Sequence, residues 1–157
     1  MPSPRTMSRS RTYPIAVGDA FARTLATPLD ELFDRRYLAL PPIVRVEQDG
    51  DWATTGQVRT IHTGDGGEMR EELTSVEAPT EFTYDLRPQS GPMKPLIARV
   101  EGAWRFAPVG TGCRIEWAWT VHPASAAGAA VLPVFARMWR GYAGRALDRL
   151  EDLLLGV

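Results

Sequence analysis

Cysteine and histidine are scarce in this 157-residue sequence. Cys113 is the only cysteine, so no disulfide bond can form within the chain. This cysteine usage is typical of a reduced, cytoplasmic protein. His62 and His122 are the only histidines, so a zinc site would need carboxylate ligands as well. We expect no metal and no organic cofactor.

Neither sign of charge is in excess. The chain has 18 basic and 19 acidic residues, and its net charge is -1. Nucleic-acid-binding proteins usually carry a basic surplus or stripe, so we expect no nucleic-acid partner. No apolar run approaches the roughly 20 residues that cross a bilayer, so we expect no membrane insertion. Glycine-rich phosphate loops and the G-x-S-x-G nucleophile motif are also absent.

What is present fits a globular protein. Hydrophobic residues make up 44% of the chain and charged residues 24%, and the length suits one domain. The polar segment 1–10, with Arg5 and Arg9, predicts a disordered tail before a single domain over 11–157. Oligomeric state is left open between a monomer and a homodimer, because an interface need not differ from other surface in a single sequence.

Hydrophobic periodicity and turn residues predict the order of elements. Two short helices, capped by Asp19 and Thr27, follow the first strand. A glycine-rich turn at 64–67 joins two of the later strands as a hairpin. The predicted strands are 13–17, 43–48, 56–63, 68–76, 81–87, 96–107 and 112–122, and the terminal helix is 126–155. Strands in succession with hairpin-length connections indicate an antiparallel sheet.

The terminal helix carries one apolar stripe that includes Phe135, Trp139 and Tyr142. Pro133 cannot occupy a regular helix interior without a kink, so we expect the main helix to begin near it. Gly141 and Gly144 weaken a helix relative to alanine. Close packing against a strand or room for a ligand would each explain these two glycines.

Several short motifs occur in an order that resembles a known superfamily. They are Val17 with Asp19-Ala-Phe21, Trp52, the segment 56–60, the Asp65-Gly66 turn, the segments 70–73, 78–79, 82–84 and 110–117, and the terminal helix. Over residues 10–155 the chain resembles the START/pollen-allergen-like superfamily (SRPBCC), in its bacterial polyketide cyclase/dehydrase and lipid-transport branch. The resemblance implies an α+β helix-grip fold: a curved antiparallel sheet of about seven strands around a long C-terminal helix.

The superfamily resemblance also implies a function. Its members enclose a ligand cavity between sheet and helix, so the chain is expected to bind a small hydrophobic molecule such as a lipid, polyketide or isoprenoid-like metabolite. One alternative is a polyketide aromatase/cyclase or dehydratase that acts without a cofactor. Another is a protein-interaction module without a ligand. The superfamily has no catalytic motif common to all members that could be carried over.

Strand alternation predicts which side chains face the cavity. The predicted ligand-binding set is Thr60, Leu73, Phe82, Tyr84, Trp104, Trp117, Trp119, Phe135, Trp139 and Tyr142. The charged residues Arg99, Glu101, Arg105, Arg114 and Glu116 should form a ladder on the outer face. The loop 88–95 and the turn between the two short helices are candidate lids at the cavity mouth.

His62 and Glu71 are the candidate catalytic residues. Either could remove a proton α to a carbonyl group while Tyr84 or Tyr142 holds the developing oxyanion. The same groups could instead only orient a ligand. A shift of one residue in strand register would remove His62 and Glu71 from the cavity, and Arg59 and Glu72 would then pair inside. Cys113 is expected to be a small buried hydrophobic residue.

Overall fold

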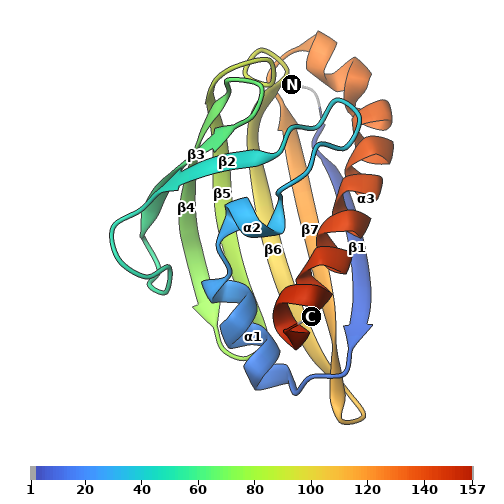
Figure 1. Ribbon diagram of the computed structural model, residues 1–157. Helices are drawn as coiled ribbons and strands as arrows, with labels where there is room; N and C mark the ends of the chain where they lie inside the picture. The colour runs from blue at the N-terminus through green and yellow to red at the C-terminus, as the bar shows by residue number, and fades with distance from the viewer. Residues whose placement is uncertain (1–2, 157) are drawn as a thin grey trace.

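The computed structural model describes residues 3–156 and consists of one curved sheet and three helices (Figure 1). The elements in chain order are β1 (Arg5–Tyr13), α1 (Val17–Ala26), α2 (Leu29–Leu32), β2 (Ile43–Glu47), β3 (Val58–Thr63), β4 (Glu68–Glu77), β5 (Glu81–Ser90), β6 (Ile97–Val109), β7 (Gly112–Pro123) and α3 (Ala126–Leu155). The strands form an antiparallel sheet in the order β1-β7-β6-β5-β4-β3-β2. The predicted helix-grip fold is therefore confirmed.

Helix α3 lies along the concave side of the sheet and supplies much of the core. Its buried residues recur every three or four positions, and they include Leu132, Phe135, Trp139 and Leu150. This spacing places them on one face, as the apolar stripe predicts. Within the described residues, no helix is long and apolar enough to cross a membrane.

The segment expected to be a disordered tail forms β1. Residues 5–13 pair with β7 along their whole length, so the first strand is 5–13 and not the expected 13–17. Only Met7 and Tyr13 of this strand are buried. Arg9 instead reaches the backbone carbonyl of Arg140 on α3, and Arg11 forms ion pairs with Asp148 and Glu151. The strand contacts the helix largely through these arginines, which is why hydrophobic periodicity did not reveal it; the Tyr13 hydroxyl adds a hydrogen bond to the Leu147 carbonyl at 2.8 Å.

Helix boundaries differ from the expected ones in three places. Helix α2 begins at Leu29 with Pro28 at its N-cap, so Thr27 ends α1 and does not cap α2. Helix α1 begins at Val17, so Asp19 lies in its first turn and does not cap it. Helix α3 begins at Ala126, where the Ser125 hydroxyl accepts a hydrogen bond from the Gly128 amide, and it continues through Pro133. Because Pro133 lies on the exposed side, its ring meets solvent rather than the sheet.

Two of the three glycines of α3, Gly141 and Gly144, allow close packing. A Cβ atom at Gly141 would overlap the Tyr37 ring, and one at Gly144 would overlap the Arg9 guanidinium. Neither glycine lines the main cavity of the protein. Of the two explanations that the sequence allows, the structure therefore favours close packing.

The convex face of the sheet carries the predicted charge ladder. Arg105 bridges Glu81 at 2.7 Å and Glu116 at 3.0 Å, and Arg99 lies 3.0 Å from Glu101. These are exposed pairs, and each contributes only about 0–1 kcal/mol to stability. The ladder keeps this face polar, while the apolar side chains of the same strands point toward α3.

Removal of residues 1–10 tests whether β1 is part of the folded protein. We expect the free energy of unfolding to fall by at least about 2 kcal/mol, because burial of Met7 alone is worth that much. Urea unfolding followed by circular dichroism measures the change. Removal of residues 1–4, which deletes no strand residue, is the matched control. An unchanged midpoint for the longer truncation would contradict the assignment.

Candidate ligand-binding site

The concave face of the sheet, α3 and the two short helices surround an internal cavity. It contains about 110 Å³ of free space, and most of its lining is apolar. Eight of the residues that strand and helix periodicity assigned to the pocket line it: Phe82, Tyr84, Trp104, Trp117, Trp119, Phe135, Trp139 and Tyr142. Leu73 is completely buried in the core beside the cavity, without lining it.

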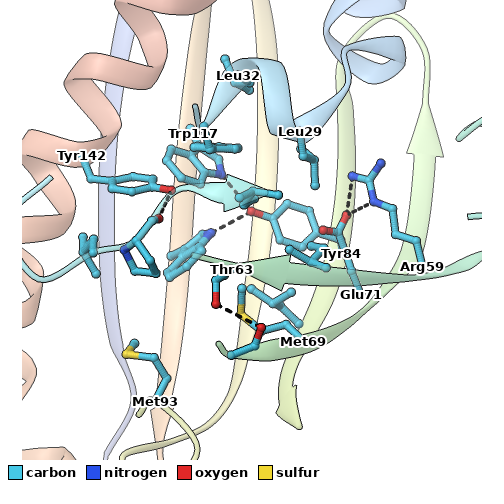
Figure 2. A pocket seen from close by; sticks show the side chains of 18 of the residues that line it. Leu29, Leu32, Arg59, Thr63, Met69, Glu71, Tyr84, Met93, Trp117 and Tyr142 are labelled. Carbon is cyan, nitrogen blue, oxygen red and sulfur yellow. Dashed lines mark hydrogen bonds and ion pairs between the residues drawn. The ribbon is translucent and has the colours of Figure 1, made fainter. Parts of the chain in front are cut away.

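Tyr84 holds the most constrained polar group of the cavity. Its hydroxyl oxygen accepts a hydrogen bond from the Trp117 indole at 2.9 Å and from the Trp119 indole at 2.7 Å. Figure 2 shows both indoles converging on this oxygen. An indole N–H can only donate, so the phenol oxygen accepts twice and its own proton is not used in either bond. No acceptor for that proton lies among the described residues, so Tyr84 can donate to a ligand.

A glycine makes this arrangement possible. Tyr84 is on β5, and both tryptophans are on β7, with β6 between them. In the register of the sheet, Tyr84 is opposite Gly102 of β6, which is opposite Trp119 of β7. A Cβ atom at Gly102 would overlap the tyrosine ring. The ring can therefore cross β6 only because this position has no side chain.

Burial has a clear effect on the acidity of Tyr84. Removal of water from the phenol raises its pKa, since the phenolate would lose its hydration, and the nearby Glu71 carboxyl raises it further. The two indole hydrogen bonds act in the opposite direction but are weaker. Tyr84 therefore stays protonated at neutral pH and serves as a donor.

Arg59 and Glu71 form a buried ion pair in the cavity wall. They are directly opposite each other on β3 and β4, and Arg59 donates to one carboxylate oxygen of Glu71, from Nη2 at 2.8 Å and from Nε at 3.2 Å. Arg59 also donates to Gln48, and its guanidinium carbon lies 4.0 Å from the centre of the Trp52 ring. Both members of the pair line the cavity, as Figure 2 shows.

The second carboxylate oxygen of Glu71, Oε2, has no hydrogen-bond partner among the described residues. Glu71 is only 3% exposed. Burial raises the pKa of its carboxyl group, and Arg59 offsets only part of that rise. The sequence could not indicate this balance, because it depends on which residue of β3 lies opposite Glu71.

His62 and Thr60 do not face the cavity, so their expected orientation is wrong. Arg59, Ile61 and Thr63 are the inward residues of β3. The hairpin closes between Thr63 and Gly67, which sets this alternation one residue away from the expected one. His62 instead lies among outer charged groups, 3.6 Å from Glu68. Arg59 pairs with Glu71, which differs from both registers considered from the sequence.

Two other cavity residues have internal partners. The Tyr142 hydroxyl donates to the Pro41 carbonyl at 3.2 Å, and the Thr63 hydroxyl donates to Asp65 at 2.6 Å. The loop expected to act as a lid begins later than predicted, since β5 extends to Ser90, but Met93 does line the cavity. Cys113 is completely buried in the core, as expected for a small hydrophobic residue.

The chain matches a known protein family over nearly its whole length. The sequence profile described as "Polyketide cyclase / dehydrase and lipid transport" matches residues 5–154. The chain belongs to this family. The matched residues run from β1 to the last turn of α3, so they include nearly the whole fold. No curated protein matches the chain.

Solved structures show the same fold at low sequence identity. The allergen Ara h 8.0201 is 18% identical, with a TM-score of 0.69 over 98% of this chain and 99% of that one. Norcoclaurine synthase from Thalictrum flavum, solved with dopamine and hydroxybenzaldehyde, is 14% identical, with a TM-score of 0.73 over 98% and 87%. Protein Ms6760 from Mycobacterium smegmatis is 18% identical, with a TM-score of 0.68 over 95% and 90%. At these identities the comparison shows that this chain has the same fold as these proteins.

The ionisation of Glu71 gives a testable pH dependence. A carboxyl group whose pKa is raised by folding stabilises the fold at acidic pH, and this contribution is lost as the pH rises toward the folded-state pKa. Glu71→Gln mimics the protonated form at every pH. We expect wild type to lose stability relative to Glu71→Gln above the ordinary glutamate pKa, by at most about 1.4 kcal/mol per pH unit.

Urea unfolding of both proteins across this pH range measures the difference. Glu116→Gln, which removes an exposed partner of Arg105, is the control for loss of a carboxylate ion pair. If wild type instead gains stability relative to Glu71→Gln as the pH rises, the pKa is lowered by Arg59 and the account of the pair is wrong.

Proposed function

We propose that this protein binds a small apolar molecule with a hydrogen-bond-accepting oxygen in the cavity between sheet and α3. The single observation that carries the proposal is the Tyr84 hydroxyl, fixed by two indole donors and left with one proton to donate. A ligand carbonyl is the simplest acceptor. Lipids, polyketides and isoprenoid-like metabolites all include molecules of this kind.

The cavity lining supports the apolar part of the proposal. Aromatic rings from β5, β6, β7 and α3 are in contact around it; the Trp104 and Trp117 rings, for example, are 5.3 Å apart between centres. Flat apolar walls with a few converging polar groups are typical of small-molecule sites. The family description, which combines cyclase, dehydrase and lipid transport, is consistent with such a ligand.

A protein-interaction role without a ligand has less support. An interaction face usually exposes a continuous apolar patch. The convex face of the sheet carries the ladder of Arg99, Glu101, Arg105 and Glu116 instead. The existence of an internal cavity also favours ligand binding over this alternative.

Acid/base catalysis on a carbonyl substrate is the second candidate, and Glu71 is the observation that favours it. Its free oxygen, Oε2, belongs to a residue of the cavity wall. As a base, the Glu71 carboxylate would take a proton from the carbon next to the carbonyl, and the electron pair would move to the carbonyl oxygen that Tyr84 holds. His62 has no part in this scheme, because it lies on the other face of the sheet.

Binding of 2-heptanone tests the first proposal. We expect Tyr84→Phe to weaken binding about three- to tenfold, the usual net effect of one lost hydrogen bond. Tyr142→Phe is the matched control, because it removes a hydroxyl from the same cavity that already donates to Pro41. Titration followed by the indole N–H signals in NMR spectra gives both affinities. An equal effect of the two substitutions would contradict the proposal.

Hydrogen exchange at the ketone tests the second candidate. In deuterated water the wild-type protein should catalyse deuterium incorporation at the carbons next to the carbonyl of 2-heptanone, and Glu71→Gln should lose this catalysis. Mass spectrometry of the ketone measures the incorporation. If the ketone binds but exchanges no faster than in buffer alone, the catalytic candidate is wrong and the binding proposal stands.

A further inference from the structure

The internal cavity is small for the ligands that its chemistry suits. It contains about 110 Å³ of free space, whereas sites for drug-sized molecules usually have about 300–1,000 Å³. A lipid or polyketide that placed its oxygen at Tyr84 would extend beyond this space. The remainder of such a ligand needs a second hollow that is continuous with the first.

A larger groove lies directly beside the cavity. It contains about 1010 Å³ and runs between α1, the start of α2, β2 and the segment 48–53. Five residues line both hollows: Leu25, Thr27, Leu29, Trp52 and Arg59. The cavity and the groove therefore share these side chains as a common wall. In Figure 2, Arg59 lies on the side of Tyr84 away from Tyr142, and Leu29 lies above the Tyr84 ring.

The chemistry of the groove suits the apolar part of a ligand. Its walls include Ala22 of α1, Val44 and Val46 of β2, and Val76 of β4. Val44 of β2 is a large hydrophobic residue, and yet it is 57% exposed. An apolar chain in the groove would cover such residues, and burial of each methylene would tighten its binding about fourfold.

The segment that carries Trp52, one residue of the wall between the two hollows, packs few side chains into the core. Trp52 is the only buried residue of the segment 48–57, and its ring stacks on the Arg59 guanidinium. Gly56 and Gln57 are hydrogen-bonded to the backbone of Leu73 on β4, whereas residues 49–55 are held by bonds within the segment, from the Gln57 side chain to the backbone of Asp51, Ala53 and Thr54. Residues 49–55 can therefore move relative to the anchored residues 56 and 57 and carry Trp52 out of the wall, since Trp52 is their only buried side chain.

We propose that the groove is a second subsite of the ligand site, which takes the apolar tail of an elongated ligand whose oxygen is held at Tyr84. This inference rests on the proposed function. The ligand class is then an oxygenated molecule with a long apolar chain, and not a compact one that fills the cavity alone. The tail passes between Leu29 and Trp52, where the cavity and the groove share their wall.

Methyl ketones of two lengths test the proposal, with 2-pentanone as the short probe and 2-undecanone as the long one. Wild type should bind 2-undecanone at least about 100-fold more tightly, because the added methylenes are buried in the groove. Val44→Asp should weaken 2-undecanone at least about fivefold by placing a charge on that path, and should leave 2-pentanone unchanged. Ala22→Glu, on the opposite wall, should do the same.

Val109→Asp is the matched control. Val109 is 50% exposed at the end of β6 and lines neither hollow. Unchanged binding of 2-pentanone shows that each variant is folded. If Val44→Asp and Ala22→Glu bind 2-undecanone like wild type, the second subsite is wrong while the Tyr84 site stands. If wild type binds neither ketone, the proposed function itself is wrong, and the second subsite with it.

Discussion

The hydrogen bonds from two indoles to the Tyr84 hydroxyl are the interaction on which the candidate site depends. They connect β5 to β7 across β6, and they need Gly102 at the crossing point. Because both indole groups donate, the phenol has one remaining role, which is to donate to something in the cavity. The position of the ring, the direction of its proton and the polarity of the ligand all follow from these contacts.

The Arg59–Glu71 pair is the second polar centre, and it behaves differently. Breaking a buried ion pair by removing one partner usually costs about 3–5 kcal/mol, but the pair itself adds little net stability because both ions lose their hydration. The pair therefore contributes little to the net stability of the fold. The position of Arg59 in the wall between cavity and groove, with Trp52 stacked on its guanidinium, is the more informative observation.

Much of the fold could be predicted from the sequence, because it depends on local signals. The stripe of Phe135 and Trp139 predicts the grip helix, and the glycine-rich turn at 64–67 predicts the β3–β4 hairpin. Strand β1 could not be predicted in this way. Its contacts with α3 come largely from Arg9 and Arg11, whose pattern resembles that of an exposed polar tail.

The candidate site was predicted only in part, for a reason of geometry. Aromatic residues on β5, β6 and β7 were assigned to the cavity by alternation, and the structure brings them together there. The orientation of His62 was wrong because it depends on the length of one turn, and one residue reverses the face. No sequence pattern indicates that Tyr84 crosses over Gly102, since this contact joins three strands that only the folded sheet aligns.

The infrared carbonyl stretch of bound 2-heptanone, labelled with carbon-13 at the carbonyl, tests the central claim most directly. A hydrogen bond from Tyr84 would weaken the carbonyl bond, so we expect a lower stretching frequency in the wild-type complex than in the Tyr84→Phe complex. Tyr142→Phe should match wild type. The same frequency in wild type and Tyr84→Phe would show that the tyrosine proton does not meet the ligand, and would contradict the account of this site.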